Sequence, residues 1–179
     1  MNYGEDKKMV ENALGDAEEF KIIFDRYKNL VNFIIKRMMG NAREVDDLFQ
    51  DAFILIWKSL KKFRGECSLT TYINKIVVNM CLNKIKKQEF EIVELKENIT
   101  ANSDDLINSH ELKRSIKYVL NSLRPDYRAL LILREVQGLS YEEIAKILNC
   151  RVGKVKVNLH RARCMFKEKY KEEIKNESR

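Results

Sequence analysis

The stretch of sequence that decides the fold is SYEEIAKILNCRVGKVKVNLHRARCMFKEK, residues 140–169. Ser140 and Glu143 have the spacing of a capping box, which predicts a helix start, and Gly138 just before them can end a preceding helix. Apolar residues recur at helical spacing on both sides of an interruption at Asn149 and Cys150. The pattern predicts two short helices joined by a tight turn, which is a helix-turn-helix.

The second helix of this motif combines an apolar stripe with a basic surface. The stripe predicted to face inward consists of Val152, Val155, Leu159, Ala162 and Phe166. The polar side chains predicted to face outward, toward a DNA groove, are Lys154, Lys156, Asn158, His160, Arg161 and Arg163. An isolated charged helix is more often only a solvated surface. The capped helix and the short turn before it favour DNA binding here.

Length and charge set the broad class of the whole chain. Its 179 residues, 45% of them hydrophobic, suit one ordinary globular domain or two small ones. The net charge of +7 favours an acidic partner, either nucleic acid or anionic lipid. No signal-peptide pattern opens the chain, and its apolar runs are too short to span a bilayer. We therefore expect a soluble, cytoplasmic protein without membrane insertion.

Residue types that carry catalysis are sparse and scattered. The four cysteines, Cys67, Cys81, Cys150 and Cys164, show no paired metal-knuckle spacing. His160 and Cys164 lie one helical turn apart, but two ligands from one helix make a poor metal site. No nucleophile arrangement and no glycine-rich phosphate loop is present. We expect neither an enzyme nor a bound cofactor or metal.

Apolar spacing along the chain predicts an all-α protein with two helical domains. The first spans residues 1–87, with a core from about residue 17 and helices at 17–39, 41–63 and 68–87. Asn41 with Glu44 is the predicted cap of the second helix. Residues 88–110 are rich in Glu and Asp and predict an acidic linker. Helical spacing resumes over 111–179, where Pro125 marks a helix start and the helix-turn-helix follows.

Two long stretches then resemble one family. Glu44 to Lys87, EVDDLFQDAFILIWKSLKKFRGECSLTTYINKIVVNMCLNKIKK, is similar to region 2 of the extracytoplasmic-function (ECF) sigma factors of RNA polymerase. Ser122 to Arg163, SLRPDYRALLILREVQGLSYEEIAKILNCRVGKVKVNLHRAR, is similar to region 4 of the same family. Both stretches occur in the family's order, separated by the acidic segment. The resemblance implies a sigma factor that binds core polymerase and directs promoter-specific initiation.

For the first stretch, the resemblance implies a polymerase-docking surface and a DNA-melting surface. The expected docking residues for the β′ coiled coil are Asp46, Asp47, Gln50 and Asp51. The residues expected to capture a flipped base and the strand of the −10 element are Phe63, Arg64, Asn79, Asn83 and Lys84. An extruded base needs a stacking surface and an amide, and the strand needs cations. Phe63 is equally consistent with an ordinary core residue, and Tyr72 stands where the family usually has tryptophan.

For the second stretch, the resemblance implies that Lys156, His160 and Arg161 contact the −35 element, flanked by Asn158. Two positions depart from the family pattern. The usual Gly-Thr-Val-Lys-Ser is here Gly153-Lys154-Val155-Lys156-Val157. Lys154 adds phosphate attraction, whereas Val157 contacts only a thymine methyl group or packs. We expect an upstream element that differs from the family's common one.

The implied partners are promoter DNA and core polymerase, through the β′ coiled coil and the β flap. An anti-sigma factor is a further expected partner of the family, although no residue identifies one. Two other classes remain as alternatives: a conventional helix-turn-helix regulator with N-terminal helices for dimerisation or sensing, and a helical adaptor. The regulator does not explain Asp47, Gln50 and Asn79 at these spacings, and the adaptor does not explain the basic helix.

Overall fold

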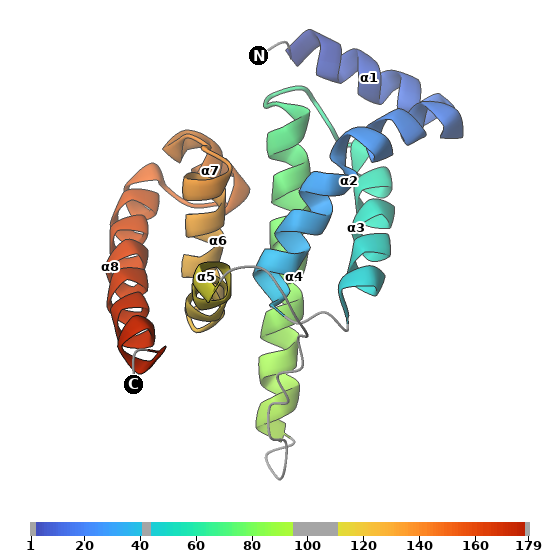
Figure 1. Ribbon diagram of the computed structural model, residues 1–179. Helices are drawn as coiled ribbons and strands as arrows, with labels where there is room; N and C mark the ends of the chain where they lie inside the picture. Colours follow the sequence, from blue (N-terminus) through green and yellow to red (C-terminus); the bar gives the residue numbers. More distant parts are fainter. Residues whose placement is uncertain (1–2, 41–43, 95–110, 178–179) are drawn as a thin grey trace.

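The structure is a computed structural model that describes residues 3–40, 44–94 and 111–177 (Figure 1). Every element in these ranges is a helix, as the apolar spacing predicts. None of the described helices is both long enough and apolar enough to cross a membrane. The predicted cap at Asn41 and most of the predicted acidic linker, residues 95–110, lie outside the described residues.

The N-terminal helices are α1 (Tyr3–Gly15), α2 (Ala17–Met39), α3 (Val45–Leu60) and α4 (Leu69–Glu94). Helix α2 has the predicted limits, because the Asp16 carboxylate accepts from Glu18 N at 2.9 Å and Gly40 adopts φ 70° at the other end. Rings from α2 and α3 form a cluster at the edge of the core, with neighbouring centroids 4.5 to 6.5 Å apart: Phe20, Phe24, Phe49, Phe53 and Trp57.

Three features of this half differ from the predictions. Helix α1 was not expected, because it buries only two small apolar side chains, Val10 and Ala13, and is otherwise mostly polar. Helix α3 ends at Leu60, and a turn rather than helix leads to Phe63. Helix α4 continues past the predicted end at Lys87 to Glu94. Glutamate and glutamine are good helix formers, so an acidic composition did not by itself end the helix.

The C-terminal half contains α5 (Glu111–Asn121), α6 (Pro125–Leu131), the π-helical segment η2 (Ile132–Val136), α7 (Tyr141–Ile147) and α8 (Val152–Glu177). Pro125 opens α6 as predicted, and Gly138 at φ 69° closes the helical run with a bond from its N–H to Arg134 O at 3.2 Å. The second helix of the helix-turn-helix is much longer than the expected short one, because α8 runs on through Tyr170 and Ile174 to Glu177.

The two halves pack against each other. Helix α4 contacts α6 and α7, while α2 contacts α5 and α6 (Figure 1). The buried Arg128 guanidinium of α6 donates to Leu120 O at 2.9 Å, to Asn121 O at 2.6 Å, and also to Met38 O at the end of α2. Burial lowers the pKa of Arg128, and these carbonyls compensate the buried charge. One residue thereby joins both halves.

Candidate nucleic-acid interface

The helix-turn-helix is built by local interactions at its start and at its turn. Ser140 Oγ accepts from Glu143 N at 3.1 Å, and Glu143 Oε2 accepts from Ser140 N at 2.9 Å, so the predicted capping box is present. Asn149 adopts φ 48°, a left-handed conformation that asparagine tolerates better than most residues. Cys150 N then donates to Ala145 O at 3.0 Å. These contacts orient α8 across α7.

Helix α8 separates an apolar face from a basic one, as predicted. Val155, Leu159 and Ala162 are at most 1% exposed and pack into the core, with Val152 and Phe166 packed against it. The exposed side chains on the other faces are Lys154, Lys156, Val157, His160, Arg161 and Arg163, and Asn158 is half-buried. Val157 is 52% exposed, so its methyl groups are not part of this chain's core.

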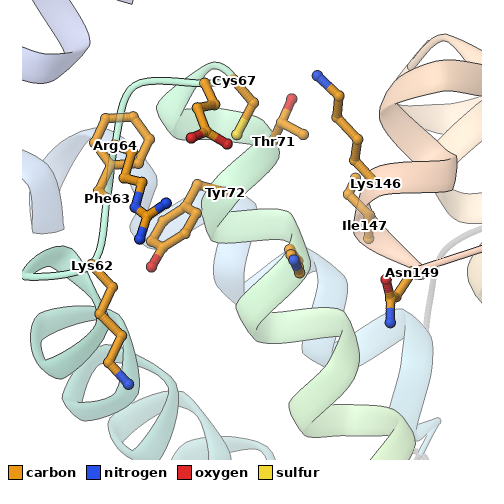
Figure 2. A pocket seen from close by; sticks show the side chains of 11 residues that line it. Lys62, Phe63, Arg64, Cys67, Thr71, Tyr72, Lys146, Ile147 and Asn149 are labelled. Atoms are coloured by element: carbon orange, nitrogen blue, oxygen red, sulfur yellow. The ribbon is translucent and has the colours of Figure 1, made fainter.

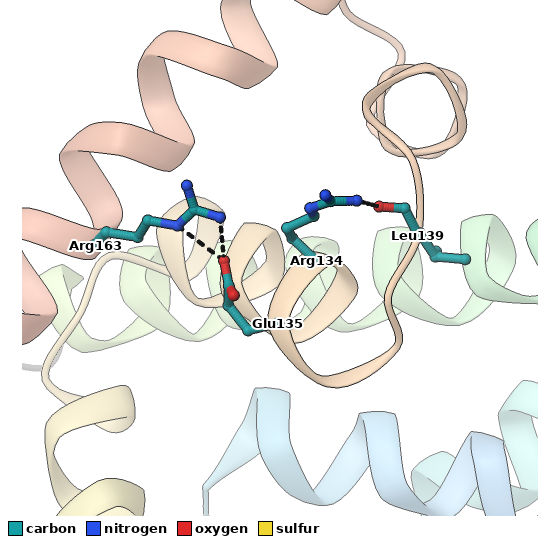
Figure 3. Close-up of polar contacts among 4 residues, drawn as sticks. All are labelled: Arg134, Glu135, Leu139 and Arg163. Atoms are coloured by element: carbon teal, nitrogen blue, oxygen red, sulfur yellow. Dashed lines mark hydrogen bonds and ion pairs between the residues drawn. The ribbon is translucent and has the colours of Figure 1, made fainter.

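Two residues that the sequence analysis did not single out support the basic face. The Tyr141 ring lies between two cations, with Arg134 Cζ 4.9 Å and Lys156 Nζ 5.9 Å from its centroid. Arg134 also donates to Leu139 O at 2.7 Å (Figure 3). These distances are typical of cation–π contacts, which restrict the Lys156 side chain. The only sequence signal for this cluster is an aromatic residue at the first position of a capped helix.

Arg163 differs from the other outward cations because it already has an acidic partner. Its Nε and Nη2 atoms donate to Glu135 Oε1 at 2.9 and 2.6 Å, so α8 is joined to η2 (Figure 3). The Glu135 hydrogen bond raises the pKa of Arg163. Part of its charge is therefore neutralised within the chain.

Of the residues expected at the −10 element, Phe63 and Arg64 lie in the loop before α4, Asn79 and Asn83 lie on one side of α4, and Lys84 lies on another side, near Glu44. The half-buried Phe63 ring packs on Tyr72, with centroids 5.1 Å apart, and Tyr72 Oη donates to Ser59 O at 2.8 Å. Tyr72, Lys75, Asn79 and Asn83 follow one another at helical spacing and therefore share a face. Phe63 is thus both packed against the core and accessible from a neighbouring pocket.

That pocket, of about 340 Å³, lies between the two halves of the chain. Figure 2 shows Phe63, Arg64 and Tyr72 on one side and Lys146, Ile147 and Asn149 on the other. Its lining also includes Lys62, Lys75 and the half-buried thiol of Cys67, whose pKa is raised by burial. A basic pocket with an aromatic pair at one wall has the chemistry that a flipped nucleotide needs.

Two of the expected −10 residues have partners within the chain. Asn79 Nδ2 donates to Lys75 O at 2.7 Å and to Ile147 O of α7 at 3.2 Å. Lys84 Nζ lies 3.4 Å from Glu44 Oε2. Asn83 and Arg64 are exposed. In this arrangement the Asn79 amide is therefore already hydrogen-bonded to the half that contains the helix-turn-helix.

The acidic surface on α3 is exposed as expected. Asp46, Asp47, Gln50 and Asp51 all project into solvent, and none of the three carboxylates forms an ion pair with another described residue. Ile54 and Leu55 lie one turn further along the helix and are 50% and 40% exposed. Ile54 lies on the side of α3 opposite the buried Leu48, Ala52 and Ile56, and Leu55 lies beside it. Together the six residues form a docking-type surface, acidic at one end and apolar at the other.

The described residues contain no group of three or more His, Cys, Asp or Glu side chains that would hold a metal ion. His160 Nε2 and Cys164 Sγ are 3.8 Å apart on α8, as their spacing predicts.

Comparison with known proteins identifies the family. The chain matches sigma-70 region 2 over residues 23–91 and sigma-70 region 4 over residues 113–163. It is 31% identical to the ECF RNA polymerase sigma-E factor of Haemophilus influenzae, over 92% of this chain and 94% of that protein. Identity to the sigma-E factor of Escherichia coli is 33%, over 88% of this chain and 90% of that protein.

Solved structures share the fold. The sigma factor RpoE of Bartonella quintana, solved with the anti-sigma factor NepR, matches with a TM-score of 0.70 and 24% identity over 86% of this chain and 98% of that one. CnrH, solved with the cytosolic domain of CnrY, matches with a TM-score of 0.65 and 20% identity over 91% and 95%.

The chain belongs to the ECF sigma factors of the sigma-70 family. It is a sigma factor for promoter recognition by RNA polymerase, a non-catalytic subunit rather than an enzyme. Since the match extends through the N-terminal helices as well as the helix-turn-helix, it favours this class over a conventional regulator or an adaptor.

Proposed function

We propose that the exposed face of α8 reads the −35 element in the major groove through Lys154, Lys156, Val157, Asn158, His160 and Arg161. The observation that carries this proposal is the separation of faces on α8, where Val155 and Leu159 are buried while Lys156 and Arg161 are exposed. A helix with its apolar side anchored and its basic side free is what insertion into a groove requires.

The −35 sequence bound by this chain differs, on this proposal, from that of its relatives. Lys154 offers a mobile cation that favours phosphate contact, and the exposed Val157 offers methyl groups to a thymine. Lys154 donates hydrogen bonds but, unlike a threonine hydroxyl, accepts none, and Val157 has no hydrogen-bonding group to replace that of serine.

The −10 element is opened and held, on this proposal, by Phe63, Arg64, Asn79, Asn83 and Lys84. Phe63 and Arg64 line the basic pocket, and Asn79 and Asn83 share a face of α4 with Tyr72 and Lys75 of that pocket, which supports the assignment of these four residues. Lys84 is assigned from the family resemblance. Asn79 must exchange its bond to Ile147 O for one to a base, so the two halves must separate at this point. Lys84 must likewise loosen its pair with Glu44 before it holds a phosphate.

Core polymerase docks on α3, on this proposal, with Asp46, Asp47, Gln50 and Asp51 facing the β′ coiled coil. Ile54 and Leu55 would supply the apolar centre that stable protein interfaces contain. Region 4 would contact the β flap. The proposed limits are 1–87 for the region 2-like domain, 88–110 for the acidic linker and 111–179 for the region 4-like domain. Residues 88–94 of the proposed linker continue α4 as helix.

An anti-sigma factor is proposed as a regulator, because the matched sigma factor RpoE was solved with the anti-sigma factor NepR and the matched CnrH with the cytosolic domain of CnrY. The proposed place of action is the cytoplasm, in association with the nucleoid through polymerase.

Run-off transcription tests the proposal directly. Purified chain and core polymerase are incubated with a pool of genomic promoter fragments, and transcripts are sequenced to locate the start sites. We expect initiation at a small set of promoters that share upstream and −10 elements, and none without the chain. Transcription that starts at the same sites with and without the chain would contradict it.

A further inference from the structure

A carboxylate of the N-terminal helix bonds to the first residue of α4, far away in sequence. Asp6 Oδ2 accepts a hydrogen bond from the backbone N–H of Leu69 at 2.8 Å, across 63 residues. Leu69 is fully buried and is the first residue of α4, so its N–H is one of the donors that an α-helix leaves unsatisfied at its start. Asp6 therefore caps a helix to which it does not belong.

The Asp6 bond has a different effect from the local cap of α4, which is Ser68. Ser68 Oγ accepts from Thr71 N at 3.1 Å, which closes the first turn of α4 on itself. Such a bond does not fix where the helix start lies relative to the rest of the domain. The Asp6 bond does, because α1 packs along α2 and so joins the start of α4 to the domain core. The carboxylate also lies at the positive end of the α4 dipole, which favours its charge.

The loop between α3 and α4 lies against the same helix α1. Gly65 adopts φ 73°, and the nearest atoms to a side chain built on it belong to Lys7, at 3.8 Å from its Cβ. Asp6 and Lys7 are adjacent on α1, so the bond to Leu69 and the close passage at Gly65 involve the same part of that helix. The segment between Phe63 and Leu69 is thus bonded to α1 at its end and passes near α1 in its middle.

We infer that Asp6 is a positioning residue for −10 recognition: it holds the Arg64–Ser68 loop and the start of α4 in the geometry that captures the flipped base. The inference rests on the proposed role of Phe63, Arg64 and Asn79. Asp6 itself touches no DNA, and acts through Leu69 N and the loop that precedes it. On this inference, α1 takes part in promoter melting through Asp6 and does not only pack against the core.

The test compares two capping aspartates of the same domain. Asp6→Ala removes the long-range cap at Leu69 N and leaves the local Ser68 cap of α4 in place, and the matched control Asp16→Ala removes the cap of α2, where Asp16 Oδ1 lies 2.9 Å from Glu18 N. Holoenzyme is assembled with each variant on a promoter duplex recovered by the run-off experiment, with 2-aminopurine in the −10 element to report base unstacking. Affinity for core polymerase and melting temperature are measured in parallel.

We expect Asp6→Ala to lower the equilibrium extent of −10 opening by on the order of fivefold, which converts to about 1 kcal/mol. Affinity for core polymerase should be unchanged. Asp16→Ala should lose similar thermal stability but leave −10 opening intact, and Asp6→Asn, which keeps an acceptor oxygen, should recover most of the opening. Equal opening defects in Asp6→Ala and Asp16→Ala, or normal opening in Asp6→Ala, would overturn the inference.

Asn79→Ala in the same assay distinguishes failure of the proposed −10 site from failure of the Asp6 positioning role. A defect in Asn79→Ala with normal opening in Asp6→Ala removes only the positioning role. Normal opening in both variants removes the −10 site itself, and with it the basis for the inference.

Discussion

On the proposed function, single residues on α8 determine which DNA this sigma factor selects. Lys154 and Arg161 both project from its exposed side, but a lysine ammonium acts as a point charge, whereas an arginine guanidinium can bond two acceptors on one base edge. We therefore assign Arg161 to sequence reading and Lys154 to phosphate attraction. The half-exposed Val157 adds an apolar contact at a position where the family has a hydroxyl.

Arg161→Ala should weaken selection of the −35 element, because a lost base contact costs about 1–3 kcal/mol of discrimination. The measurement is competition footprinting of holoenzyme on the recovered promoter against variants of its upstream element. Lys171→Ala is the control, since it removes the same charge from an exposed site further along α8. Equal loss of discrimination in both variants would contradict the groove assignment.

The reactivity of the cysteine thiols provides a second test at the scale of single residues. Burial raises the pKa of Cys81 to about 12, whereas Cys164 is exposed on α8. At pH 8 about one Cys81 in ten thousand is then a thiolate, and the thiolate is the form that reacts.

We expect iodoacetamide to modify Cys164 first and to spare Cys81 in the folded chain, as read by peptide mass spectrometry. All four cysteines should react in guanidinium. Modification of native Cys81 as fast as Cys164 would show that α4 is not buried as described.

At the scale of elements, α3 and α4 present two different surfaces of one domain. Helix α3 turns its acidic and apolar residues to solvent on the side opposite Leu48 and Ile56, which are buried. Helix α4 presents Tyr72 and Lys75 to the pocket and the Asn79 amide to α7. A change on α3 should therefore affect polymerase binding without affecting DNA contacts.

The double change Asp47→Ala and Gln50→Ala should raise the Kd for core polymerase on the order of tenfold, equivalent to about 1.4 kcal/mol, with little loss of stability because both side chains are exposed. Binding is measured by fluorescence anisotropy of labelled chain. Glu11→Ala with Asn12→Ala is the matched control, as it removes one exposed carboxylate and one exposed amide from α1. Unchanged affinity in the α3 variant would remove the docking assignment.

At the scale of the whole molecule, α4 contacts α6 and α7 of the other half, and α2 contacts α5 and α6. Helices α4 and α7 meet through Asn79 Nδ2 to Ile147 O and through Thr71 Oγ1 to Glu143 Oε1, both at 3.2 Å. The end of α2 meets α5, where a side chain at Gly40 would lie 2.6 Å from Asn121 Nδ2. Elements at −10 and −35 are about 25 base pairs, or about 85 Å, apart along B-DNA. Helix α8, at 26 residues, is about 39 Å long, which is less than half of that separation on the DNA.

The halves should therefore separate when the chain joins polymerase. Dyes placed by unnatural amino acids at Lys21 on α2 and Lys171 on α8, both exposed, report their distance by energy transfer. We expect efficient transfer in the free chain and a large drop on addition of core polymerase. A chain labelled at Lys21 and Glu11, both in the N-terminal half, is the control. Its energy transfer should stay the same when core polymerase is added. Unchanged transfer in the first pair would contradict the separation.

Local chemistry explains which parts of the fold were predictable. The spacing of apolar residues predicted the limits of α2, and the Ser140–Glu143 box predicted the start of α7, because both patterns act within a few residues of themselves. Helix α1 was missed because little of it is apolar, and the end of α4 was misplaced because its acidic residues are also helix formers. The π-helical segment η2 has no sequence pattern of its own in this chain.

The sequence by itself determined the helical class, the helix-turn-helix, the faces of α8 and the family resemblance, because each depends on side chains a turn or two apart. Only the tertiary structure brought Asp6 to Leu69 N and Ile147 O to Asn79, across 63 and 68 residues. No periodic pattern encodes such pairs, since they arise when separately stable helices pack. These long-range contacts hold the start of α4 against α1 and keep the Asn79 amide bonded to the helix-turn-helix half.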